Sequence, residues 1–202
     1  MGLVEGLGEI GMSARLPTLT TRRLVLRSLE LGDAAAVENL AGRDFEIARW
    51  MTSFSWPYQA GAAEAFLEAN AAADPVADEA AFGVTLGGVL IGVVAIEAPG
   101  DLEEQPDCPT LGYWFGRPFH GFGYAREAAM AALEWGFEAH GGCPAIAARV
   151  FEENKRSRAV LRKLGFRAVG KTVRYAKPLD RKIDNIVMRL ERGDFETGRK
   201  AA

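Results

Sequence analysis

The sequence predicts one mixed α/β domain, and three observations lead to this fold class. The chain of 202 residues is 49% hydrophobic and 25% charged, which is the balance of a single globular domain with a sizeable core. Some segments alternate apolar and polar residues, as strands do, whereas others repeat apolar residues at helical spacing. These two kinds of segment follow one another in mixed order, and the chain has no internal repeat.

Three helices and three strands are expected in the first half of the chain. The helices are expected over residues 34–40, 47–51 and 62–73, with Asp33 as the N-cap of the first and Pro75 ending the third. The strands are expected over residues 23–29, 82–86 and 89–96. Gly87-Gly88 joins the last two strands and tolerates the positive φ angles of a tight hairpin turn.

The second half is expected to add four strands and two helices. The fourth strand is expected over residues 110–115 and the fifth over 145–151, followed by strands over 167–175 and 183–190. The longest helical pattern covers residues 125–140 and ends at Gly141-Gly142. A shorter helix, which Asn154 can cap, is expected to run to Leu164, with Gly165 terminating it.

Charge is divided sharply along the chain, although the net charge is only −3. Residues 50–116 contain ten Asp and Glu and no Lys or Arg, whereas residues 155–182 contain eleven Lys and Arg against Asp180 alone. A charged run is usually solvated surface. Two runs of opposite sign in one small domain favour two ligands of opposite charge.

Composition argues against several classes of protein. The longest apolar run, residues 87–96, is too short to span a bilayer, and the N-terminal residues lack a signal-peptide pattern, so we expect a cytoplasmic protein. Cys108 and Cys143 fit neither a disulfide framework nor a zinc site, so we expect no metal. One domain is expected over residues 18–193, between a flexible lead-in over 1–17 and a flexible tail over 194–202.

A glycine-containing segment between a strand and a helix predicts a phosphate site. The segment is His120-Gly121-Phe122-Gly123-Tyr124-Ala125. Glycines let the backbone approach a phosphate closely, and a helix N-terminus adds roughly half a positive charge and unpaired N–H donors. The dinucleotide fingerprint Gly-x-Gly-x-x-Gly does not fit, because Arg126 takes the third glycine position and no acidic residue near position 145 could bind a ribose.

Five segments, taken together and in order, carry a family resemblance. They are Arg22-Arg23-Leu24-Val25-Leu26-Arg27, Leu90-Ile91-Gly92, Leu111-Gly112-Tyr113-Trp114, Gly121-Phe122-Gly123-Tyr124-Ala125-Arg126-Glu127-Ala128, and Asn154-x-x-Ser157 ahead of Leu164-Gly165-Phe166. In these segments residues 19–190 resemble the Gcn5-related N-acetyltransferase (GNAT) family, in the branch that includes the ribosomal-protein N-terminal acetyltransferases.

The resemblance implies a GNAT fold and acetyl-CoA as the co-substrate. The implied fold is a mixed, mostly antiparallel sheet of six to seven strands, splayed between the fourth and fifth and flanked by about four helices. The implied coenzyme-binding residues are Tyr113, Trp114, Phe115, His120, Gly121, Phe122, Gly123, Tyr124, Ala125, Arg126, Asn154 and Ser157. Asn154 has an equally good alternative role as a helix cap. His120 and Arg126 replace residues that are more usual in the family.

The resemblance also implies that an amine attacks the thioester directly in a ternary complex, with a main-chain N–H of the fourth strand stabilising the oxyanion. Relatives place a glutamate base at positions corresponding to Thr110 or Ala176, and this chain has a carboxylate at neither. The surviving candidates for the base are Glu97, Tyr175 and Asp184, alone or through water.

A proton donor for the departing thiolate is the other group that this chemistry requires. The tyrosine that serves in many relatives is replaced here by Leu161. Ser157 matches the hydroxyl residue that the ribosomal-protein branch can use. Its alternative role is that of an ordinary serine in the first turn of a helix.

The expected partner is an amine acceptor of cationic character, because the acidic run lies where the acceptor cleft is found in the family. A protein N-terminus, a polyamine and an aminoglycoside all fit this description. We expect no membrane and no nucleic-acid partner, and a homodimer is left open. Two alternatives to an acetyltransferase are a catalytically silent coenzyme A sensor on the same fold and a succinyl-CoA-dependent transferase.

Overall fold

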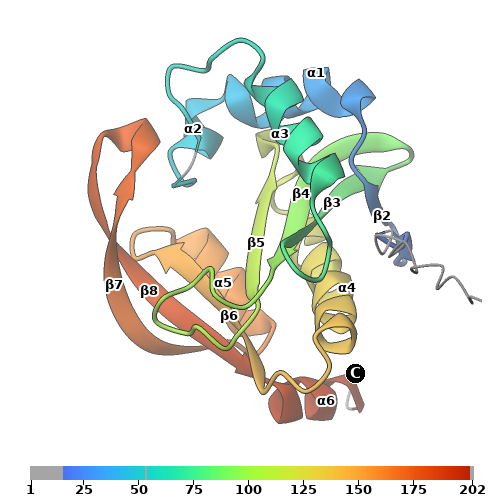
Figure 1. Ribbon diagram of the computed structural model, residues 1–202, viewed down its shortest axis with the longest axis vertical. Helices are drawn as coiled ribbons and strands as arrows, with labels where there is room; N and C mark the ends of the chain where they lie inside the picture. The colour runs from blue at the N-terminus through green and yellow to red at the C-terminus, as the bar shows by residue number, and fades with distance from the viewer. Residues whose placement is uncertain (1–15, 53, 201–202) are drawn as a thin grey trace, which may run out of the picture.

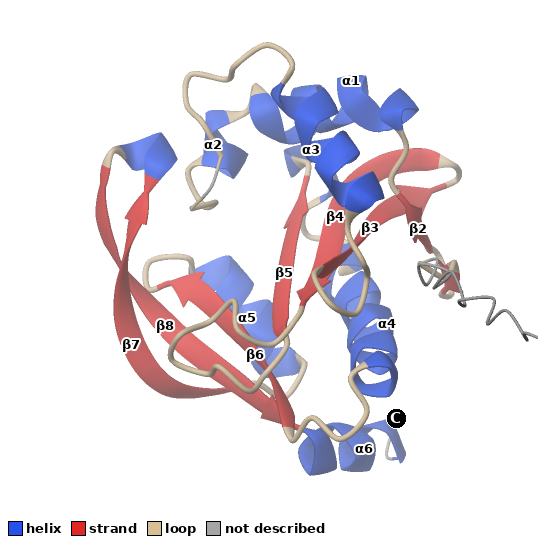
Figure 2. Cartoon of the chain, viewed as in Figure 1, coloured by secondary structure: helices blue, strands red, loops and turns tan. Residues whose placement is uncertain are grey.

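The protein is described from a computed structural model, in which residues 16–52 and 54–200 are placed well enough to describe. They form one sheet with helices on both faces (Figures 1 and 2). The strands are β1 (Leu19–Thr20), β2 (Val25–Ser28), β3 (Glu79–Leu86), β4 (Val89–Glu97), β5 (Thr110–Phe115), β6 (Ala145–Phe151), β7 (Arg167–Ala176) and β8 (Arg181–Glu191). The α-helices are α1 (Ala34–Val37), α2 (Phe45–Ala48), α3 (Ala62–Ala72), α4 (Tyr124–Ala139), α5 (Lys155–Lys163) and α6 (Arg192–Lys200).

The expected fold class is confirmed by the strand order, which is β1-β2-β3-β4-β5-β6-β8-β7. Every neighbouring pair is antiparallel except β5 and β6, which are parallel. The described residues form eight strands, one more than the expected maximum, because the two-residue β1 extends the edge. The predicted bounds of β5 and β6 agree with the structure, and Gly87 and Gly88 form the β3–β4 turn with φ angles of 58° and 85°.

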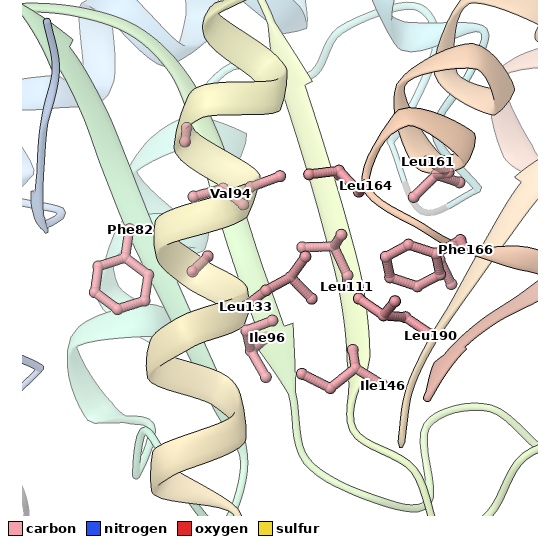
Figure 3. Close-up of a cluster of buried hydrophobic side chains, with 14 of the residues drawn as sticks. Phe82, Val94, Ile96, Leu111, Leu133, Ile146, Leu161, Leu164, Phe166 and Leu190 are labelled. Carbon is pink, nitrogen blue, oxygen red and sulfur yellow. The ribbon is translucent and has the colours of Figure 1, made fainter. Parts of the chain in front are cut away.

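The two faces of the sheet carry separate apolar layers. The α4 face, covered by α4 and α5, buries the larger cluster, which includes Phe82, Ile96, Leu111 and Leu133 (Figure 3). The opposite face, here called the α3 face, packs against α1, α2 and α3 through a second cluster. Further along the α3 face, the loop over residues 98–109 covers β6 and β8, with Leu102 fully buried beneath it. The sheet therefore lies between two separate sets of buried side chains, one on the α4 face and one on the α3 face.

The region around α1 differs from expectation. Asp33 makes no side-chain capping bond to α1 and instead accepts two hydrogen bonds of 2.8 Å from the Arg27 guanidinium. The helix expected over residues 34–40 is α-helical only to Val37 and continues as a π-helical turn over Glu38–Gly42. A strong bidentate ion pair thus replaces the predicted cap.

The C-terminal segment is a helix, so the expectation of a flexible tail over residues 194–202 is wrong for residues 194–200. Helix α6 follows β8 without a break, and Phe195 is only 5% exposed. Its ring lies 4.9 Å from that of Phe137 on α4, measured between centroids. Burial of one aromatic side chain anchors this otherwise charged helix. Most of the lead-in expected over residues 1–17 lies outside the described residues.

Candidate active site

Strands β5 and β6 are paired at a single point and diverge beyond it (Figure 1). Thr110 of β5 pairs with Ala147 of β6, and the Ala147 amide donates to the Pro109 carbonyl at 2.9 Å. The outer edges of these two strands are held by β4 and β8 along their lengths. The splay expected between the fourth and fifth strands is therefore present, with its closed end at Thr110.

Main-chain groups of β5 line this splay. The Gly116 amide donates to the Ile91 carbonyl of β4 at 3.0 Å. Because successive residues of a strand direct their N–H and C=O groups to opposite edges, Tyr113 and Phe115 direct theirs away from β4, into the splay. The amides of Tyr113 and Phe115 have no hydrogen-bond partner in the described part of the chain. The splay can accept an extended ligand that pairs with them.

The predicted phosphate loop lies at the N-terminus of α4. Gly121 and Gly123 have φ angles of 87° and 81°, a conformation in which a side chain is strained. The first paired amide of the helix is that of Glu127, which donates to the Gly123 carbonyl at 3.1 Å. Among the described residues, the amides of residues 121–126 have no partner. Unpaired donors concentrated at a helix N-terminus suit a diphosphate.

Arg23 braces this loop, a role that the sequence did not reveal. Its Nε donates to Glu127 Oε2 at 2.7 Å, and its Nη1 donates to the Phe122 carbonyl at 3.0 Å. Thr21 Oγ1 donates to the other oxygen of Glu127 at 2.7 Å. These bonds lower the pKa of Glu127 despite partial burial. The only sequence signal was the position of Arg23 in a family motif, since its partner lies 104 residues away.

The two residues that depart from the family pattern have different surroundings. His120 Nε2 lies 2.7 Å from the Phe115 carbonyl, which accepts its hydrogen bond in one tautomer. His120 therefore closes the loop onto the open end of β5. Arg126 is exposed on the first turn of α4 and makes no ion pair with another described residue. Its guanidinium is available to an anion bound at the loop.

The three aromatic residues of β5 do not share one surface. Tyr113 lies on the α4 face, where its hydroxyl is 2.8 Å from Ser157 Oγ, and burial raises the pKa of Tyr113 to about 12. Trp114 is buried among the residues of the α3 face, and Phe115 is buried in the α4-face core. Tyr113 and Phe115 thus share the α4 face, because strand residues alternate between faces, and of the three side chains that of Tyr113 contacts α5 through Ser157.

Asn154 and Ser157 stand at the start of α5. Asn154 Oδ1 accepts a hydrogen bond from the Ser157 amide at 3.1 Å, so the structure shows the capping role. This bond leaves the Asn154 amide nitrogen free of any partner among the described residues. The Ser157 hydroxyl is held beside Tyr113 on the α4 face. Asn154 thereby fixes the helix turn that positions Ser157.

A row of polar side chains crosses three strands on the α3 face, at the closed end of the splay. Glu79 of β3 is directly opposite Glu97 of β4, which is directly opposite Thr110 of β5. Such neighbours have Cβ atoms about 4.5–5.5 Å apart. Asp101, in the loop after β4, hydrogen-bonds Glu97. We call Glu79, Glu97, Asp101 and Thr110 the acidic row.

The acidic row is short of hydrogen-bond donors and positive charge. Burial, Asp101 and Glu79 raise the pKa of Glu97 to about 8, against the opposing charge of Arg149. Burial and Asp101 also raise the pKa of Glu79. No ion pair of the three carboxyl groups occurs in the described part of the chain. Thr110 is 6% exposed, and its hydroxyl has no partner among the described residues.

The ligand-free protein should lose stability as pH rises, because of Glu97. Its pKa is about 8 in the folded protein and about 4.5 in an unfolded chain, so its contribution is complete below pH 4.5 and is lost as pH rises through 8. The melting temperature should fall over this range, by about 2–4 °C for each kcal/mol lost. Scanning calorimetry of wild type and Glu97→Gln checks this. An equal slope in the two proteins would contradict it.

Tyr175 is not part of the acidic row. It lies on β7 next to the buried Ala176, so its side chain is on the other face of the sheet, where it is 51% exposed. Its hydroxyl hydrogen-bonds Asp180 at the turn before β8. Asp184 also lies on that outward face, since it is paired with Val173. The structure thus brings neither candidate base together with Glu97.

A Walker-type pattern also occurs in the chain and is not a phosphate loop. Residues 165–172 read Gly-Phe-Arg-Ala-Val-Gly-Lys-Thr, which has the spacing of that motif. A Walker loop follows a strand and opens a helix, whereas this segment follows α5 and runs into β7. Lys171 donates to Glu152 at 2.7 Å instead of facing a cavity. The spacing alone is therefore uninformative here.

The acidic run is partly neutralised by the basic run. Arg174 contacts Glu103 and Glu104 of the loop over residues 98–109, at 3.2 Å and 3.0 Å.

No group of three or more His, Cys, Asp or Glu side chains within the described residues could hold a metal ion. No helix in the described ranges is long and apolar enough to cross a membrane.

Together, the splayed sheet and the unpaired loop amides suit an extended ligand that carries a diphosphate. Residues 23–167 match the family described as acetyltransferase (GNAT) domain, and the chain belongs to this family. It is an acetyltransferase. Curated protein sequences include no match to the chain.

Solved structures share the fold. RimJ of Mycobacterium smegmatis, in complex with CoA-disulfide, has 25% sequence identity and a TM-score of 0.72, covering 85% of this chain and 83% of its own. The ribosomal-protein-S5-alanine acetyltransferase of Vibrio fischeri has 19% identity and a TM-score of 0.71, covering 89% and 98%. The microcin C7 self-immunity acetyltransferase MccE, in complex with acetyl-CoA and AMP, has 16% identity and a TM-score of 0.70, covering 85% and 93%.

Proposed function

We propose that this acetyltransferase uses acetyl-CoA to acetylate a cationic primary amine by direct attack in a ternary complex. The observation that carries the proposal is the continuity of two unpaired sets of main-chain amides. One set lies at residues 121–126 and the other at Tyr113 and Phe115, along the open edge of β5. The first suits the diphosphate of the coenzyme and the second suits its pantetheine arm.

The donor is expected on the α4 face, where residues from three elements surround the splay. The loop amides and Arg126 would bind the diphosphate, and Tyr113 and Ser157 would lie beside the sulfur end of the pantetheine. The coenzyme complexes of two proteins with this fold, RimJ and MccE, support the assignment of the ligand. Acetyl-CoA supplies an activated thioester, whose carbonyl carbon is the electrophile.

The acceptor is expected on the α3 face, where the acidic row lies. An ammonium group has three N–H donors and no acceptor. Glu79, Glu97 and Thr110 offer oxygen acceptors side by side across three strands, and a bound ammonium group would relieve the burial and carboxylate repulsion that raise the pKa of Glu97 to about 8. A neutral amine or an alcohol would leave that repulsion in place. The acidic row therefore favours a primary amine that arrives protonated.

In this proposal, a group on the α3 face accepts a proton from the amine, and a group on the α4 face donates a proton to the sulfur. Glu97, ionised above pH 8, takes a proton from the ammonium, directly or through water, because only the neutral amine is nucleophilic. The amine nitrogen bonds to the thioester carbon, and a main-chain N–H of Tyr113 or Phe115 stabilises the oxyanion. As the C–S bond breaks, the Ser157 hydroxyl, hydrogen-bonded to Tyr113, passes its proton to the sulfur and is reprotonated through water by the second proton that the amine nitrogen gives up. The products are an N-acetyl amine and free coenzyme A, and Glu97 then releases its proton to solvent.

A thiol-release assay tests the proposal. Acetyl-CoA is offered with polyamines, aminoglycosides and peptides that have a free N-terminus, and the same peptides with a blocked N-terminus are the matched controls. We expect release with at least one cationic amine, none with the blocked peptides, and an acceptor KM that rises with salt. Coenzyme A binding without thiol release on any amine would overturn the enzymatic proposal in favour of a sensor.

A further inference from the structure

We propose that Phe122, supported by Tyr124, is a stacking platform for the adenine ring of the coenzyme. This inference rests on the proposed function, because it assumes that a coenzyme diphosphate lies on the amides of residues 121–126. It assigns to the Phe122 side chain a role separate from that of the loop backbone: it recognises the nucleotide end of the donor.

Phe122 exposes its ring although nothing in the loop requires an aromatic residue. The side chain is 60% exposed, the largest exposure of any aromatic residue among the exposed large hydrophobics of the described chain. It stands between Gly121 and Gly123, whose positive φ angles already shape the turn. A polar residue at this position would satisfy the backbone equally well. The ring is therefore available to a ligand at no structural cost.

The orientation of the Phe122 ring is fixed before any ligand arrives. It stacks on Tyr124 with centroids 5.6 Å apart and an angle of 26° between planes. The Arg23 guanidinium lies 4.5 Å from the Tyr124 ring centroid and also binds the Phe122 carbonyl. Glu127 in turn holds Arg23. A platform ordered in this way loses little side-chain freedom when a flat ligand binds.

Adenine is the ligand group that fits this place. In coenzyme A only a ribose separates the adenine from the diphosphate. A diphosphate bound to the loop amides therefore keeps the adenine near the side chain of Phe122. Aromatic side chains bind bases by stacking, without requiring hydrogen bonds to the base edges. A protein partner is a poorer fit, because a stable protein interface buries far more surface than one ring provides.

Calorimetric titration of three ligands tests the platform without knowledge of the acceptor. Coenzyme A and dephospho-coenzyme A both contain adenine, whereas 4′-phosphopantetheine does not. Phe122→Ala is expected to weaken the first two by roughly fivefold to 20-fold and 4′-phosphopantetheine by less than about twofold. Phe122→Trp should restore the affinity for both adenine ligands, and Leu31→Ala, at another exposed apolar residue, should leave all three unchanged.

The outcomes separate this proposal from the proposed function. An equal loss for all three ligands in Phe122→Ala would show that the ring acts on the loop backbone and would overturn the platform. Unchanged affinity for coenzyme A would overturn it as well, while leaving the function intact. If wild-type protein bound none of the three ligands, the proposed function would fail, and the platform with it.

Discussion

Replacing Glu97 by Gln is expected to lower kcat for acetyl transfer by about 100-fold or more at pH 8, because removal of a general base usually costs this much. The affinity for coenzyme A should not change, since Glu97 lies on the α3 face and the donor is expected on the α4 face. Steady-state kinetics with the best amine of the panel, combined with calorimetric titration of coenzyme A, measures both quantities.

The pH dependence gives this prediction a second readout. Glu97 accepts a proton only when ionised, and its pKa of about 8 means that kcat/KM should rise with pH up to about 8. This rise of kcat/KM with pH, the acidic limb of the pH profile, should be absent in Glu97→Gln. In Glu79→Gln, the matched control, one of the charges that raise the pKa of Glu97 is gone, so the limb should persist and move to lower pH. A Glu97→Gln enzyme within a few-fold of wild type would remove Glu97 from the mechanism.

The neighbours of Glu97 show where sequence reasoning stops. The two-residue Gly87-Gly88 turn could be read from the sequence, and on its own it would place Glu97 opposite Asp78. A β-bulge between Val84 and Thr85 shifts the register by one residue, so Glu79 stands opposite instead. A one-residue shift moves a side chain to the other face of a sheet. No sequence pattern in these residues predicts the bulge, so the acidic row could not be predicted from the sequence.

Strand bounds, by contrast, were readable from the sequence where local signals were strong. The bounds of β5 and β6 agree with the structure because β-rich runs stand between turn residues in both. Helix α6 was missed because it is largely charged, and the single buried ring of Phe195 is visible only against Phe137. The loop motif predicted the turn and helix N-terminus that the structure shows at residues 121–124, but the brace of this loop by Arg23 depends on a contact across 104 residues. Local structure could be predicted from the sequence, and long-range pairing could not.

Arg126→Glu is expected to weaken coenzyme A binding by roughly 30-fold or more without destabilising the protein. Gly123 is the N-cap of α4, so residue 126 occupies the third helical position, N3. A glutamate at N3 can accept from the N-cap amide and interacts favourably with the helix dipole, so the melting temperature should hold or rise slightly. The same carboxylate would compete for the loop amides that we assign to the diphosphate and would repel its charge.

Opposite changes in stability and affinity are what identify the loop amides as the binding group. If Arg126 contributed only a distant positive charge, Arg126→Gln would cost about half the binding free energy that Arg126→Glu costs, because it removes one unit of charge and Arg126→Glu changes the charge by two. If the amides are the ligands, Arg126→Gln should cost about threefold or less, because a neutral side chain competes poorly with a diphosphate. Arg181→Glu makes the same charge change at the exposed start of β8 and should leave the affinity unchanged. Equal losses in Arg126→Glu and Arg181→Glu would reduce the effect to net charge.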